Sequence, residues 1–111
     1  MLNHKQRLLG LCLSLCIGVA HAELSVGQQL ALDSNKGNCH ACHALPGAQI
    51  SGTIGPEIKA IAQKFPDIKQ LQAFIRDPAL SNPNTIMPPY GRHRILTESE
   101  IIEISEFIYT L

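Results

Sequence analysis

The pentapeptide Cys39-His40-Ala41-Cys42-His43 constrains this chain more than any other feature. The pattern C-x-x-C-H is the attachment signature of a c-type haem. Its two cysteines reach the two vinyl groups on one edge of the porphyrin, and the histidine that follows offers an imidazole nitrogen to the iron. The motif therefore predicts one covalently attached haem c, with Cys39 and Cys42 as the thioether residues and His43 as an axial ligand.

Two other kinds of site use closely spaced cysteines, and neither fits this chain. A thioredoxin-like pair belongs in a βαβ unit, whereas no segment here alternates apolar and polar residues over a useful length. A zinc site takes four convergent ligands, commonly from two separated pairs. The remaining cysteines, Cys12 and Cys16, lie in an N-terminal apolar run. A haem also supplies apolar filler to a core in which aromatic residues are only 5% of the chain.

The first residues have the layout of a secretory signal. A basic start precedes the almost continuous apolar run 8–20, and Ala20-His21-Ala22 offers small residues at positions −3 and −1 of a cut. Such a start, a short apolar run and an A-x-A site together are typical of a cleaved signal peptide. We expect residues 1–22 to be removed, which leaves residues 23–111 as one periplasmic domain.

Two membrane-bound alternatives to a cleaved signal are disfavoured. The apolar run is about 13 residues long, whereas a membrane-spanning helix needs about 20. A lipoprotein signal needs a small residue before its cysteine, but Leu11 precedes Cys12 and Leu15 precedes Cys16. The sequence therefore predicts no membrane anchor.

The net charge of the chain argues against a nucleic-acid partner. The whole chain carries nine basic and nine acidic residues. Without Lys5 and Arg7, which fall in the expected signal, the remainder has a net charge of −2. A nucleic-acid-binding domain has a strongly basic surface, so we expect no nucleic-acid partner.

The distal side of the iron needs its own ligand, and Met87 is the strongest candidate. It is the only methionine beyond the expected signal, and Pro88 and Pro89 follow it. Methionine is usually a core filler, but neighbouring prolines favour a stiff, extended loop that suits a fixed ligand better. A His/Met pair raises the haem potential. His93 and, less plausibly, His40 are the alternatives.

Apolar spacing predicts short helices and long loops, which makes the fold all-α. A Thr-x-x-Glu capping box opens the last helix at Thr97, and Pro56 is placed to open another. Helical stripes cover about 26–31, 56–65, 68–76 and 98–111. The loops 44–55 and 79–96 remain, and loops of that length in a small domain are usually functional. We expect both to wrap the haem.

This layout resembles a class I cytochrome c, in which terminal helices flank a haem motif and a methionine loop precedes the last helix. In that family a small residue on one terminal helix meets an aromatic residue on the other, and Gly27 and Phe107 match those positions. The family also has a Gly-Pro whose proline carbonyl accepts the second imidazole N–H of the haem histidine. Gly55-Pro56 matches this feature, so the resemblance assigns Pro56 to support His43 and residues 23–111 to a cytochrome c domain.

A narrower resemblance rests on residues 37–47 and 82–97, whose sequences are similar to the SoxX family. Members of that family are the monohaem cytochrome subunits of SoxAX complexes, which conjugate thiosulfate oxidatively to a cysteine of a carrier protein. The resemblance implies a heterodimer with the cytochrome SoxA, the carrier SoxYZ and a soluble electron acceptor as transient partners, and an L-cysteine S-thiosulfotransferase complex. It implies electron transfer, and no catalytic residue, on this chain.

Two other functions remain open at the level of sequence. The first is a free soluble monohaem carrier that donates electrons to a terminal oxidase. The second is an enzyme that binds a ligand at the iron, which requires Met87 to be absent from the iron or displaceable. The tip of the methionine loop, residues 86–90, distinguishes a free carrier from a subunit of a permanent complex. If its apolar residues form an exposed patch, they mark a partner site.

Overall fold

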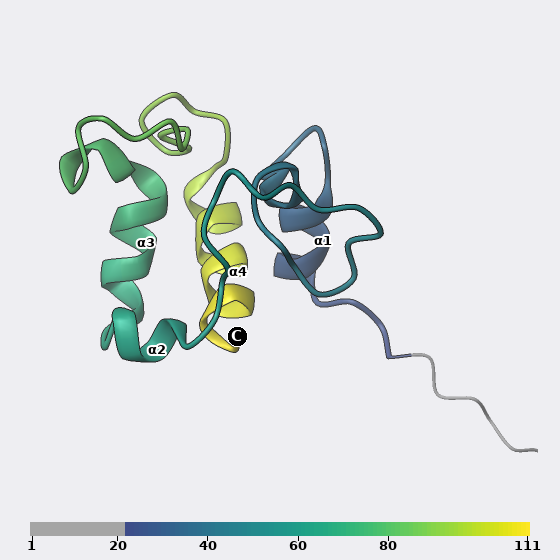
Figure 1. Cartoon of the computed structure of the whole chain (residues 1–111). Helices are drawn as coiled ribbons and strands as arrows, with labels where there is room; N and C mark the ends of the chain where they lie inside the picture. The colour runs from purple at the N-terminus through teal and green to yellow at the C-terminus, as the bar shows by residue number, and fades with distance from the viewer. Residues whose placement is uncertain (1–21) are drawn as a thin grey trace, which may run out of the picture.

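Short helices and long loops make up residues 22–111, the part of the chain that the computed structural model describes (Figure 1). The predicted all-α architecture is confirmed, since the described residues form helices and loops and contain no strand. The predicted signal peptide lies, apart from its last residue, outside the described part. The helical elements are α1 (Val26–Leu32), η1 (Cys39–Ala41), α2 (Ile61–Lys64), α3 (Ile68–Arg76), η2 (Pro78–Leu80) and α4 (Glu98–Tyr109).

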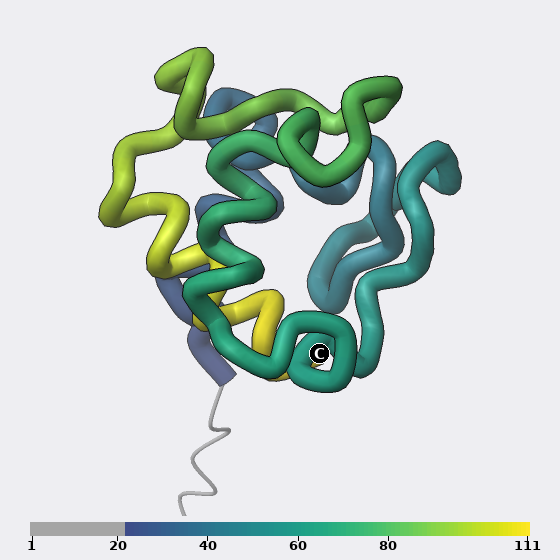
Figure 2. Tube along the Cα trace, turned by 90° about the vertical axis from the view of Figure 1, so that its left-hand side faces the viewer, coloured from purple at the N-terminus to yellow at the C-terminus, as the bar shows by residue number. Residues whose placement is uncertain are grey.

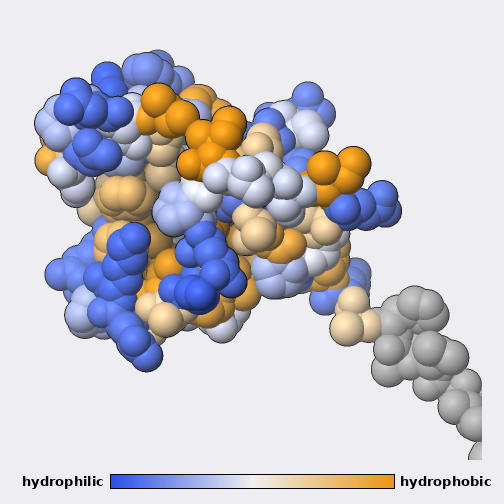
Figure 3. Space-filling model, in the orientation of Figure 1, coloured by the Kyte–Doolittle hydropathy of each residue, from blue (hydrophilic) through white to orange (hydrophobic). Residues whose placement is uncertain are grey.

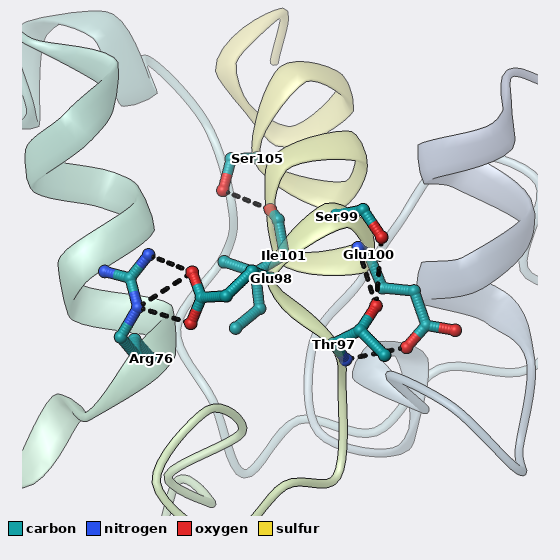
Figure 4. Close-up of polar contacts among 7 residues, drawn as sticks. All are labelled: Arg76, Thr97, Glu98, Ser99, Glu100, Ile101 and Ser105. Carbon is teal, nitrogen blue, oxygen red and sulfur yellow. Dashed lines mark hydrogen bonds and ion pairs between the residues drawn. The ribbon is translucent and has the colours of Figure 1, made fainter.

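Side-chain caps define where the longer helices begin. Thr97 and Glu100 form the predicted capping box at the start of α4, and each side chain accepts a hydrogen bond from the other residue's backbone N–H (Figure 4). Asp67 and Gln70 form the same arrangement at the start of α3. Each box satisfies two backbone N–H groups that have no partner inside the helix.

The prediction that Pro56 opens a helix is wrong. Residues 56–60 are not helical, and α2 begins only at Ile61 and is four residues long. Ala60 has a φ of 50°, in the left-handed region that interrupts a right-handed helix. The carbonyl of Pro56 lies 2.7 Å from Nδ1 of His43, so it serves a long-range contact instead of a helical hydrogen bond.

The helix α4 lies between α1 and α3 and packs against both (Figure 1). Its buried face includes Ile101, Ile104 and Ile108, and Ser105, which is also buried, donates to the carbonyl of Ile101 at 2.6 Å. Where α1 crosses α4, a Cβ atom at Gly27 would overlap the backbone carbonyl of Glu103. The same Cβ atom would lie 3.0 Å from Cβ of Phe107, the aromatic residue expected opposite Gly27, so only glycine allows this approach.

An ion pair joins α3 to the start of α4. Arg76 donates to both carboxylate oxygens of Glu98, with a shortest N···O distance of 2.6 Å (Figure 4). The exposed pair contributes little stability by itself, but its two-oxygen geometry fixes the end of α3 beside the first turn of α4. The loop that carries Met87 runs between these two helix ends.

Candidate haem site

A cavity of about 330 Å³ lies at the centre of the described residues. Residues of α3 and of the loop before α2 line it, and Figure 2 shows the backbone of these two segments facing each other. All five residues that the sequence singled out line this cavity: Cys39, Cys42, His43, Pro56 and Met87. Most of the other lining side chains are apolar, and α4 contributes Ile104 and Ile108. A single apolar cavity thus collects residues that are far apart in the sequence.

The two cysteines of the motif are free thiols on and beside the short helix η1. The backbone N–H groups of Cys42 and His43 both donate to the carbonyl of Cys39, at 3.2 and 2.9 Å. This tight turn presents both cysteines and the histidine to the same cavity. Burial raises the pKa of Cys39 to about 11, so its sulfur is in an apolar environment suited to a thioether.

The ring of His43 is held by the loop that follows the motif. Its Nδ1 lies 2.7 Å from the carbonyl oxygen of Pro56. A carbonyl can only accept, so Nδ1 carries the proton and Nε2 keeps a free lone pair. A Cβ atom at Gly55 would overlap the imidazole ring. Glycine at this position therefore lets the backbone lie directly against His43.

Met87 is half-buried and packs against the hydrophobic core. Its backbone N–H donates to Oγ1 of Thr85 at 3.1 Å, which fixes the turn before it. His93, the alternative ligand, is exposed, does not line the cavity, and has Nε2 at 3.3 Å from the guanidinium of Arg92. His40 does not line the cavity either, and its Nδ1 is buried without a hydrogen-bond partner.

The tip of the methionine loop divides into a buried and an exposed part. Tyr90 is 8% exposed, and its hydroxyl donates to the carbonyl of Gly37 at 2.7 Å. Ile86 is 78% exposed. The sequence places both residues in one apolar stretch and does not predict the hydroxyl contact, because no local pattern links residues 53 positions apart.

The donor set and the lining fit a c-type haem. Two free thiols stand beside a histidine whose Nε2 is available, a thioether lines the same cavity, and most of the remaining lining side chains are apolar. A zinc site does not fit, because residues 22–111 hold no cluster of three or more His, Cys, Asp or Glu side chains suited to a metal ion.

Comparison with known proteins gives the same assignment. The model of the family described as cytochrome c matches residues 25–111. The chain belongs to the cytochrome c family. The predicted haem c, covalently attached, is thereby confirmed, and Cys39 and Cys42 fit its C-x-x-C-H motif.

The cytochrome also has a curated relative, a protein of Aquifex aeolicus named "Uncharacterized lipoprotein". The two are 35% identical over 77 residues, which are 68% of this chain. The chain spans only about 37% of that protein's length. The cytochrome is an extracytoplasmic protein, as its family indicates. From residue 22 onward, none of its helices is long and apolar enough to cross a membrane.

The cytochrome is a c-type electron carrier, and its residues have distinct tasks around the cofactor. When bound, haem c supplies one-electron chemistry at iron. Pro56 orients the imidazole of His43 and increases its basicity through the proton held at Nδ1. The side chains of Ile104, Ile108 and Phe74 line the cavity and exclude water from it. A lower local polarity is one of the means by which a protein tunes a haem potential.

Proposed function

We propose that this cytochrome is the electron-transfer subunit of a periplasmic SoxAX-type complex, with His43 and Met87 as the axial ligands of its haem. The larger partner is a second cytochrome of the SoxA kind, and the complex conjugates thiosulfate to a cysteine of a SoxYZ-type carrier. The proposal rests on the similarity of residues 37–47 and 82–97 to the SoxX family and on the surface around the haem cavity.

The exposed apolar rim of the haem cavity is the observation that carries this proposal. Ile54 and Ile86 both line the cavity, and they are 70% and 78% exposed. Figure 3 shows hydrophobic surface emerging among hydrophilic groups on one face of the molecule. Exposed apolar patches mark partner sites, and permanent interfaces are more hydrophobic than transient ones. This rim supports a lasting partner over the brief contacts of a free carrier.

We assign the sulfur chemistry to the partner, because the proposed His43 and Met87 ligands would fill both axial positions of the iron. An iron with imidazole and thioether ligands has no open position for a substrate. Among the described residues, the cavity lining contains no hydrogen-bonded Ser-His-Asp arrangement, and its one ion-paired side chain, Glu57, is bound to the exposed Lys59 outside the lining. Electron acceptance is therefore the task we assign to this chain.

The decisive experiment is purification of the native protein followed by sedimentation and visible spectroscopy. We expect a stable heterodimer with a second, larger cytochrome. We also expect haem reduction by thiosulfate only when that partner and its carrier protein are present. A single species at the mass of one haem chain, reduced by thiosulfate alone, would contradict the proposal in favour of a stand-alone protein.

A pair of matched variants tests whether the rim is the interface. Ile86→Asp places a charge on the rim, and Ile50→Asp places one at an 83% exposed site that does not line the cavity. We expect Ile86→Asp to weaken the heterodimer and Ile50→Asp to leave it intact, with the haem spectrum unchanged in both. Equal dissociation in both variants, or in neither, would rule out this rim as the interface.

A further inference from the structure

Tyr90 links the methionine loop to the segment that precedes the haem motif. Its hydroxyl donates to the carbonyl of Gly37 at 2.7 Å, and the contact is buried. The motif begins two residues after Gly37, at Cys39. A tyrosine hydroxyl keeps its proton at neutral pH, and burial raises the pKa of Tyr90 further, so the hydroxyl remains a donor.

The Gly37 end of this contact is firmly held. The N–H of Gly37 donates to the carbonyl of Leu30 at 3.0 Å, and the N–H of Asn38 donates to that of Asp33 at 3.0 Å. A Cβ atom at Gly37 would lie 3.0 Å from the carbonyl oxygen of Leu30, so the segment lies tightly against the end of α1. The acceptor of the tyrosine hydroxyl is thus part of the helical frame.

The backbone of Tyr90 is held as well. Its carbonyl accepts from the N–H groups of Ile95 and Leu96 at 2.9 and 3.1 Å, and these residues lead into α4. The N–H of the next residue, Gly91, donates to the carbonyl of Arg76 at the end of α3 at 3.0 Å. Tyr90 and Gly91 therefore tie this part of the methionine loop to Gly37, to the end of α3 and to the residues that lead into α4.

Two prolines restrict how far Met87 can move relative to Tyr90. Pro88 and Pro89 alone separate Met87 from Tyr90, and each proline ring locks its φ near −65°. The Pro88-Pro89 segment between the two residues consequently has few accessible conformations. On the other side, Thr85 accepts the N–H of Met87. Met87 is thus held from both directions, and the Tyr90 hydroxyl supplies a hydrogen bond from this loop to the segment before the motif.

We propose that Tyr90 is a positioning residue for the distal haem ligand: its hydroxyl bond to Gly37 keeps Met87 at the iron against competing ligands. This inference rests on the proposed ligation by Met87. When the methionine loop opens, the hydroxyl must leave Gly37, so the free energy of that bond contributes to keeping the loop closed. Removal of the hydroxyl makes Met87 easier to displace.

The test is an imidazole titration of the oxidised holoprotein, followed in the visible spectrum. Tyr90→Phe removes the hydroxyl and keeps the ring. Tyr109→Phe is the matched control, because its hydroxyl also donates to a backbone carbonyl, that of Pro66 at 3.0 Å, away from the methionine loop. A buried hydrogen bond of ordinary strength predicts about tenfold tighter apparent imidazole binding in Tyr90→Phe and no change in Tyr109→Phe.

A third variant separates this inference from the proposed ligation. Met87→Ala leaves no thioether, so imidazole should bind it without competition and more tightly than it binds Tyr90→Phe. If Met87→Ala binds imidazole no better than the unaltered protein, the ligation is wrong and the role of Tyr90 falls with it. If Met87→Ala opens the iron but Tyr90→Phe titrates like Tyr109→Phe, Tyr90 is only a structural contact and the inference is overturned.

Discussion

Gly55→Ala is the most direct perturbation of the histidine side of the site. A Cβ atom at this position would overlap the imidazole of His43, so the ring or the loop must move. Overpacking of this kind costs about 1–3 kcal/mol. The displaced Nδ1 also loses its 2.7 Å contact with Pro56, which adds about 1 kcal/mol for a hydrogen bond whose acceptor can be hydrated instead.

These costs together predict a loss of about 2–4 kcal/mol, which lowers the melting temperature of a domain this small by roughly 10–30 °C. The reduction potential should rise, because an imidazole without its acceptor is a weaker donor to the oxidised iron. Thermal unfolding by circular dichroism and a redox titration measure the two effects. Ser51→Ala is the control, since it places alanine in the same loop without adding a Cβ atom. An unchanged melting temperature and potential in Gly55→Ala would refute the reasoning.

Three further predictions concern the cofactor, the distal ligand and pH. Replacement of both motif cysteines by alanine should give a chain that loses its haem on acid–organic extraction and is largely unfolded by circular dichroism. Met87→His should give a low-potential bis-histidine spectrum, whereas His93→Ala should change neither spectrum nor potential. The hydrogen bond from Lys36 lowers the pKa of Glu100, so its contribution to stability is present above the pKa of the unfolded chain and is lost as pH falls through the lower, folded value. Lys36→Met should flatten the melting temperature against pH in that acidic range, and an unchanged profile would contradict the assigned partner.

Local patterns explain which parts of the fold were predictable. The box at Thr97 and the stripe that starts at Ile68 depend on neighbours three or four residues away, and both helices form as expected. The helix expected at Pro56 fails because a residue 13 positions away uses its carbonyl. Helix propensity depends on nearby residues and does not include such a long-range contact. The preference of proline for a helix start is therefore overridden by tertiary structure.

In the haem site, too, features set by neighbouring residues were predictable, and features set by long-range contacts were not. The C-x-x-C-H motif is local and specific, so the haem could be inferred from five residues. The different burial of Ile86 and Tyr90 could not be inferred in this way. Both are large and lie in one apolar stretch, yet Ile86 is exposed and Tyr90 is buried. Only the partner carbonyl at Gly37 distinguishes them, and this acceptor is a backbone group that carries no residue-specific signal.

The position of α4 also has a consequence for the order of folding. Ile104 and Ile108 form part of the cavity wall, yet they come from the last helix of the chain and pack across from α1 near its start. Contacts across a loop on the order of 70 residues form slowly, since loop-closure entropy must be overcome first. The cysteines of η1, by contrast, are adjacent in the chain and are accessible before α4 has docked. Haem attachment can therefore precede the docking of α4. The attached macrocycle would then provide an apolar surface against which α4 packs.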